Sequence, residues 1–222
     1  MLLEFTTTER LIHIQDWAVV VFMLTFGIIV VTRTLFEVRF ADFTKLFFND
    51  KYLKIYRDSS QLNSIFNILL FFVQLISLTF LILIFLDYQN LLNKYEFTSF
   101  IQVFTLFGFF ILSKYLIEKI IATSFELEDF IDQFNLYKLS YRTFLGLVAF
   151  PFAVIFYYNN SNSEQVFYIL SGLILAFHLF SYLKTLRSFQ KEITYHLFYF
   201  ILYLCALEIA PYYFIYYWFI KK

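Results

Sequence analysis

The chain has 222 residues, of which 61% are hydrophobic and 24% aromatic, and its 17 basic side chains are matched by 17 acidic ones. This composition argues against a soluble globular domain, and without a basic excess no nucleic-acid partner is expected. The single cysteine, Cys205, excludes an internal disulfide and a cysteine-based metal site. All four glycines and both prolines lie inside long apolar runs, where transmembrane helices tolerate them. The sequence therefore predicts an all-α polytopic membrane protein.

Six apolar segments are long enough to cross a bilayer core of about 30 Å. The fourth is the shortest, because Pro151 interrupts it. No basic stretch precedes the first apolar run and no small-residue cleavage site follows it, so we expect this first span to be retained. The chain is thus interpreted as a single membrane domain, 1–222. Its predicted spans cover residues 16–35, 64–87, 97–121, 143–158, 166–186 and 195–220.

Basic residues distinguish the two sides of these spans. Thirteen lie in or beside the connections that follow spans one, three and five, and four lie on the opposite side. The positive-inside rule then places these three connections in the cytoplasm and both termini outside it. The richness in Phe, Ile, Tyr, Asn and Lys suggests a bacterial genome rich in A and T, and no β-barrel alternation is present. We therefore expect a multi-pass protein of the bacterial inner membrane.

Two of the cytoplasmic connections are predicted to contain amphipathic helices, over residues 36–48 and 124–138. The second begins with Thr123 and Glu126, which have the spacing of a capping box. Such helices can dock a partner, but the simpler and preferred interpretation is that they lie in the membrane interface and cover the bundle. In the first, four phenylalanines share one helical face: Phe36, Phe40, Phe43 and Phe47.

Glu208 lies near the middle of the sixth predicted span, where an ionised carboxylate is penalised by about 3 kcal/mol. Pro211 should kink the helix beside it, because proline cannot donate a hydrogen bond to the carbonyl of Leu207. A kink, free carbonyls and a carboxyl together resemble an ion or proton site. The simpler and preferred interpretation is a protonated Glu208 that donates one hydrogen bond to a neighbouring helix.

His178 is the expected neighbour of Glu208. If spans five and six form an antiparallel hairpin, His178 lies opposite Leu204, and Glu208 follows one turn later, about 6 Å along the helix axis. A lone histidine at such a position is usually a hydrogen-bonded packing residue. Metal or haem ligation would need further ligands at the same depth, so no metal and no other cofactor is expected.

Small residues at helical spacing predict close contacts among spans four, five and six, which we expect to form the compact core. Span two has no glycine and many phenylalanines and leucines, and is predicted to face lipid or a partner. Gln74 is its central polar group and is interpreted as a hydrogen-bonding bracket. Lys114 and Glu118 are interpreted as interfacial anchors that pair locally. The small residues are Gly146, Ala149 and Ala153 in span four, Gly172 and Ala176 in span five, and Ala206 and Ala210 in span six.

Four stretches of the chain carry a resemblance to a known family. They are Asp16-Trp17, the sequence FTKLFFNDKY over 43–52, the pair of Gly146 and Pro151, and YLCALEIAP over 203–211. Through them the chain is similar, from about residue 16 to residue 222, to Bacteroidota membrane proteins catalogued as domain of unknown function 4271. The Leu-Glu-Ile-Ala-Pro segment is the most specific part. The resemblance implies an inner-membrane protein of a Gram-negative bacterium and implies no particular activity.

Known catalytic signatures are missing: the sequence contains no nucleophile elbow, no HExxH zinc motif and no phosphate-binding glycine loop. No catalytic residue is assigned. We expect a non-catalytic subunit or assembly factor of a larger envelope complex, which holds an integral membrane partner through transmembrane and interfacial aromatic surface. The lipid bilayer is its other partner, and a homo-oligomer would use the same surface. The alternative is an ion- or proton-coupled transporter component that uses Glu208 with support from His178; a lipid-modifying enzyme is a weaker third.

Overall fold

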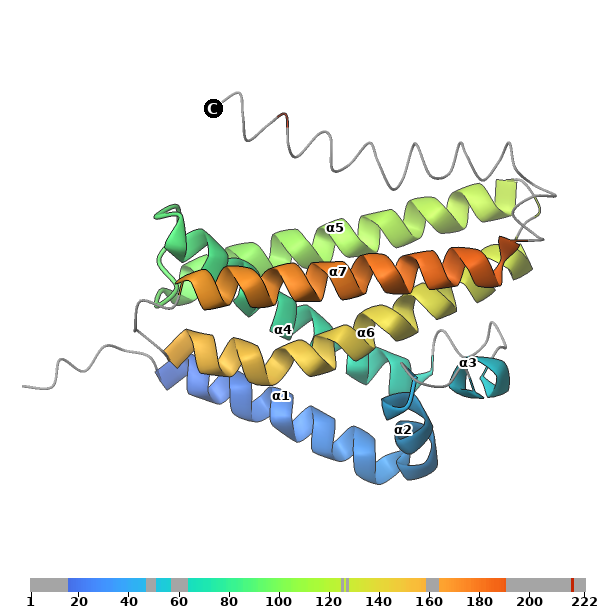
Figure 1. Ribbon diagram of the computed structural model, residues 1–222, viewed down its shortest axis with the longest axis horizontal. Helices are drawn as coiled ribbons and strands as arrows, with labels where there is room; N and C mark the ends of the chain where they lie inside the picture. Colours follow the sequence, from blue (N-terminus) through green and yellow to red (C-terminus); the bar gives the residue numbers. More distant parts are fainter. Residues whose placement is uncertain are drawn as a thin grey trace, which may run out of the picture.

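The computed structural model describes residues 16–46, 51–56, 64–124, 126, 128–158, 164–190 and 217 (Figure 1). Throughout these described residues the regular structure is helical, as the sequence predicts. The helices are α1 (Asp16–Leu35), α2 (Glu37–Thr44), α3 (Lys51–Ile55), α4 (Ile65–Tyr88), α5 (Phe97–Ser124), α6 (Glu128–Tyr158) and α7 (Glu164–Ser188).

Five of these helices, α1, α4, α5, α6 and α7, are long and apolar enough to cross a membrane. They correspond to the first five predicted spans and show a multi-pass membrane protein. In Figure 1 they run roughly along the long axis of the molecule, and the chain reverses direction between consecutive spans. The sixth predicted span, 195–220, lies outside the described residues except for Tyr217.

Helix α6 is longer than the sequence predicts. It is one continuous helix of 31 residues that includes both the fourth span and most of the predicted amphipathic segment 124–138. At 1.5 Å per residue it is about 46 Å long, so it extends beyond a hydrocarbon core of about 30 Å. The basic residues that indicated a connection therefore lie on a helix that continues through the interface. Pro151 lies inside α6 on its exposed side and does not end it.

Helix α4 lies at the centre of the bundle. It contacts α1, α5 and α6, and its most extensive packing is with α6. Phe66, Val73 and Phe80 are fully buried along its length. The expectation that this span mainly faces lipid or a partner is therefore wrong. Its physical basis was the lack of glycine in the span, but a close helix pair needs a small residue on only one of its two members.

That small residue is Gly146 of α6. A Cβ atom placed on Gly146 would lie 2.6 Å from the Cα atom of Gln74, in the backbone of α4. Ala149 and Ala153 of α6 are buried in the same cluster as Phe80 of α4. The small residues of α6 thus serve the contact with α4. The side chain of Gln74 is fully buried over Gly146, and neither of its polar atoms has a hydrogen-bond partner among the described residues, so it acts there by packing.

Aromatic rings join four helices at the end of the bundle where α1 begins. The indole of Trp17 lies 5.1 Å from Phe100 and 6.1 Å from Tyr157, and its Nε1 donates a hydrogen bond to the carbonyl oxygen of Tyr95 at 3.0 Å. Phe22 stacks on Phe80 with ring centroids 4.2 Å apart. Offset and edge-to-face rings contribute specific geometry as well as contact area. This cluster fixes α1 against α4, α5 and α6.

At the other end, α2 and α3 fold back onto α4 and α6. Phe43 of α2 is fully buried, and its ring lies 5.7 Å from Phe66 of α4 and 6.0 Å from Phe144 of α6. Arg39, also buried, lies over the rings of Tyr56 and Phe66 at 4.6 Å and 4.5 Å. The predicted face of Phe36, Phe40 and Phe43 thus packs against protein, in agreement with a helix that covers the bundle, and Phe47 lies outside the described residues.

We predict that replacing Gly146 with Ala destabilises the protein by about 2 kcal/mol, because the added methyl group would overlap the backbone of α4. The measurement is the free energy of unfolding in detergent micelles. Gly27→Ala is the matched control, since a Cβ atom at Gly27 meets no atom of the described residues within 4 Å. Equal effects of the two substitutions would show that α4 and α6 do not approach closely here.

A second prediction concerns the α2–α3 segment at high pH. Burial raises the pKa of the Tyr52 hydroxyl above its ordinary value of 10.0, although the neighbouring Arg39 acts in the opposite direction. Because the folded state keeps this proton longer than the unfolded state, its contribution to stability is complete below about pH 10 and is lost as the pH rises further. Thermal unfolding between pH 8 and 11 should therefore show a steeper loss for the wild type than for Tyr52→Phe. Parallel curves would contradict the prediction.

Candidate functional site

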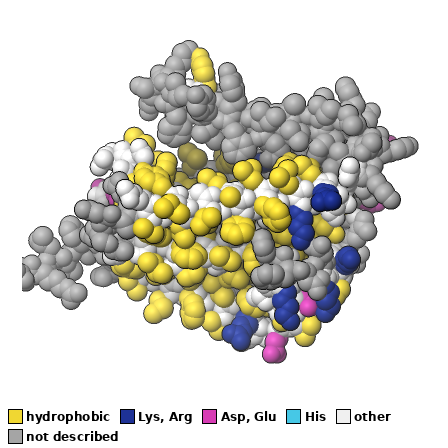
Figure 2. Space-filling model, viewed as in Figure 1, with side chains coloured by type: hydrophobic (Ala, Val, Ile, Leu, Met, Phe, Trp, Pro, Cys, Tyr) yellow, Lys and Arg dark blue, Asp and Glu magenta, His cyan; other side chains and the backbone are white. Residues whose placement is uncertain are grey.

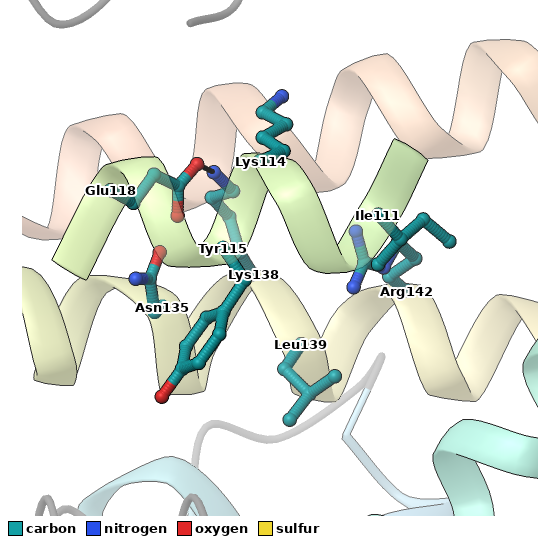
Figure 3. A pocket seen from close by; sticks show the side chains of 8 residues that line it. All are labelled: Ile111, Lys114, Tyr115, Glu118, Asn135, Lys138, Leu139 and Arg142. Carbon is teal, nitrogen blue, oxygen red and sulfur yellow. Dashed lines mark hydrogen bonds and ion pairs between the residues drawn. The ribbon is translucent and has the colours of Figure 1, made fainter. Parts of the chain in front are cut away.

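The ends of α5 and α6 carry two pairs of polar residues that face each other. On α5, Lys114 and Glu118 are four residues apart, and on α6 Lys138 and Arg142 have the same spacing. Residues four apart share one helical face, and all four of these residues line a small pocket between the two helices. In Figure 3 the Glu118 carboxylate lies beside the Lys138 amine, while the end of the Lys114 side chain points away from α6. The structure thus brings together charges that are twenty or more residues apart in sequence.

Glu118 and Lys138 form an ion pair that joins the two helices. The Lys138 Nζ donates a hydrogen bond to the Glu118 Oε1 at 3.0 Å, and the two side chains are only 16% and 4% exposed, respectively. A second ion pair, between Lys119 and Asp132 at 2.8 Å, lies nearer to solvent, with Lys119 41% exposed. The two ion pairs therefore tie α5 to α6 at two depths. The sequence predicted only a local pairing of Glu118, with Lys114.

A pocket of about 260 Å³ lies beside these charges, between α5, α6 and α7. A smaller pocket of about 60 Å³ adjoins it between α5 and α6 and is lined by Glu118 and Asn135. The larger pocket has both apolar and polar walls. Its apolar lining is Leu78, Phe107, Phe110, Ile111, Leu145, Ile174 and Leu175, and its polar lining is Lys114, Lys138, Arg142, His178 and Tyr182.

Three of the polar lining residues lie at a similar depth. The distance is measured along each helix axis from the start of α5, the end of α6 and the start of α7, which lie at the same end of the bundle. It is about 21–26 Å for Lys114, Arg142 and His178. A hydrocarbon core is about 30 Å thick, so this level is close to its edge. Basic side chains are tolerated there because they can extend to the headgroup region. The arrangement can therefore hold an anionic group at the edge of the membrane.

The residues predicted from the sequence are only partly within the described structure. His178 lines the larger pocket, but Glu208, Pro211, Ala206 and Ala210 lie outside the described residues, so the contact between His178 and Glu208 stays a prediction. Gly172 and Ala176 of α7 lie on exposed positions. Among the described residues no group of three His, Cys, Asp or Glu side chains could hold a metal ion.

Sequence reasoning missed Lys138 and Arg142 as site residues. Both were assigned to a connection on the strength of their charge, so their spacing was not compared with that of Lys114 and Glu118. The signal was nevertheless present, because two consecutive helices each carry a pair of charged residues at a spacing of four. This pattern can be recognised only once α6 is known to be one continuous helix.

We predict that Lys138→Met lowers the free energy of unfolding by about 3 kcal/mol, because it leaves the buried Glu118 carboxylate without its cation. The double variant Glu118→Gln with Lys138→Met should recover part of this loss. Lys119→Met is the matched control and should cost less than about 1 kcal/mol, since Lys119 is exposed and solvent screens its ion pair. Equal losses for the two lysines, measured by chemical unfolding in micelles, would contradict the prediction.

Comparison with known proteins adds a family. The family model described as Domain of unknown function (DUF4271) matches residues 18–219, which include every residue of the pocket. No curated protein and no solved structure matches the chain.

Proposed function

Because the chain belongs to the DUF4271 family and carries five helices able to cross a membrane, we propose that it is a non-catalytic membrane subunit or assembly factor that holds an integral membrane partner. The support comes from the apolar faces that the bundle leaves exposed. In Figure 2, hydrophobic side chains cover the middle of the visible face, and Lys and Arg gather toward one end.

The observation that carries the proposal is the exposed face of α1. Gly27 lies near its centre, and a Cβ atom there would meet no atom of the described residues within 4 Å. Val20, Met23, Leu24 and Val31 surround it at helical spacing, and all four are exposed. In a bilayer an exposed glycine between large apolar side chains allows another helix to approach closely. Since the described helices leave this notch open, we assign it to the partner.

The exposed small residues of α7 have a different proposed role. Gly172 and Ala176 also lie on the surface, but Ala206 and Ala210 of the sixth predicted span have the matching spacing. We infer that these four residues pack α7 against that span, as the sequence suggests. The face of α1 then remains for an external helix, either of another protein or of a second copy of this chain.

The proposed location is the bacterial inner membrane, with the basic end of the bundle in the cytoplasm. All described Lys and Arg residues except Lys94 lie toward the end that carries α2, α3 and the connection from α5 to α6. The positive-inside rule favours this orientation. It places α2 and α3 on the cytoplasmic side, next to any partner helix that binds α1.

The alternative, an ion- or proton-coupled transporter component, is favoured by one observation. His178 lines a pocket that also contains three cations, so a titratable side chain lies at a polar position near the edge of the membrane. Glu208, proposed to lie one turn from the level of His178, would be the second titratable group. The transporter function needs the contact between His178 and Glu208, and the scaffold function does not need it.

We predict that Gly27→Leu lowers recovery of a specific membrane partner several-fold, because the larger side chain fills the notch on α1. The measurement is quantitative mass spectrometry after affinity purification in mild detergent, with membrane levels of the chain compared in parallel. Leu106→Phe, which enlarges an exposed residue of α5, is the control and should leave recovery unchanged. A chain that purifies alone, or equal recovery with both variants, would refute the scaffold function.

A further inference from the structure

The pocket between α5, α6 and α7 has a polar end and an apolar remainder. On α5, Phe107 and Phe110 precede Lys114, and on α7, Ile174 and Leu175 precede the polar residues. Helix α6 runs in the opposite direction, and there Leu145 follows the cations. On all three helices, therefore, the apolar lining lies toward the middle of the bundle and the charges lie toward its basic end.

The polar end carries a positive charge excess. Lys114, Lys138 and Arg142 line the pocket, and Glu118 lines the smaller pocket next to it. These lining residues therefore include three cations and one carboxylate, and Lys138 forms an ion pair with that carboxylate at 3.0 Å. Proteins commonly bind phosphate groups with the guanidinium of Arg and the ammonium of Lys. All three of these cations line both pockets.

We propose that this pocket binds an anionic phospholipid. Its phosphate lies between Lys114 and Arg142, near the edge of the hydrocarbon core, and the first part of one acyl chain lies along Phe107, Phe110 and Leu175. A volume of about 260 Å³ holds this part of a lipid and not a whole molecule. The remaining chains lie in the bilayer, which they reach between α5 and α7, since among the described helices these two each pack against α6 and not closely against each other.

A lipid fits the pocket better than a free phosphate does. Inorganic phosphate would be bound by the cations alone, and the apolar wall that continues from them toward the middle of the bundle would contribute nothing. A phospholipid uses both parts, because its charged and apolar groups are separated along the same direction as those of the pocket. This site is distinct from the proposed partner face, which lies on α1.

The test is lipid binding to the full-length protein purified in a neutral detergent. Phosphatidylglycerol, phosphatidylcholine or inorganic phosphate is added, and bound molecules are counted by native mass spectrometry while the melting temperature is recorded. We expect phosphatidylglycerol to bind and to raise the melting temperature, and the other two to do neither. In the double variant Lys114→Gln with Arg142→Gln, the affinity for phosphatidylglycerol should fall on the order of tenfold or more.

Two further variants make the result decisive. Arg33→Gln with Lys45→Gln removes the same charge from exposed positions at the same end of the bundle and should bind as the wild type does. Lys114→Arg with Arg142→Lys keeps both charges and should also retain binding, which separates loss of the site from loss of the fold. Equal binding of phosphatidylglycerol and phosphatidylcholine by the wild type, equal losses in the two Gln variants, or stabilisation by phosphate alone would overturn the proposal.

Discussion

The close approach of α4 and α6 at Gly146 and Gln74 is the contact on which the rest of the bundle depends. Lipid tails are as apolar as the side chains of this protein, so helices do not associate in a bilayer to escape water, and complementary shape has to hold them together. Glycine provides that shape by letting the two backbones meet. The other spans then attach to this central pair: α5 packs against both helices, α1 packs mainly against α4, and α7 packs against α6.

The length of α6 links this packing to the candidate site. Because the helix continues beyond the hydrocarbon core, Lys138 and Arg142 lie on a rigid element opposite the end of α5. A buried ion pair with Glu118 then stabilises one arrangement of the two helices, since separating the charges would leave a carboxylate unpaired. A scaffold and a bound lipid are compatible in this arrangement: the lipid would fill the space between α5 and α7 while the face of α1 remains open to a partner helix.

The sequence predicted the helical class and the first five spans well, because the length of an apolar run is a direct consequence of membrane thickness. It failed where one observation had two physical causes. Charged residues such as Lys138 occur both in loops and on helices that leave the membrane, and a phenylalanine-rich helix such as α4 can face either lipid or other aromatic rings. The pocket was missed for the same reason, since its charges meet only after α6 is known to be continuous. Glu208, the residue that the sequence marks as most costly to place in a membrane, lies outside the described residues.

The aromatic cluster around Trp17 has a consequence for how the protein is made. Helix α1 is synthesised first, but its rings contact Phe80, Phe100 and Tyr157, which leave the ribosome much later. Helices α4 and α5 are consecutive and contact each other, so they can associate as soon as they are inserted. Helix α1 packs mainly against α4, so it can bind that helix soon after α4 is inserted. Its aromatic cluster is completed only when α6 supplies Tyr157, more than a hundred residues after the end of α1. Until then we expect the part of α1 that will contact Tyr157 to be covered by lipid or by an insertion factor.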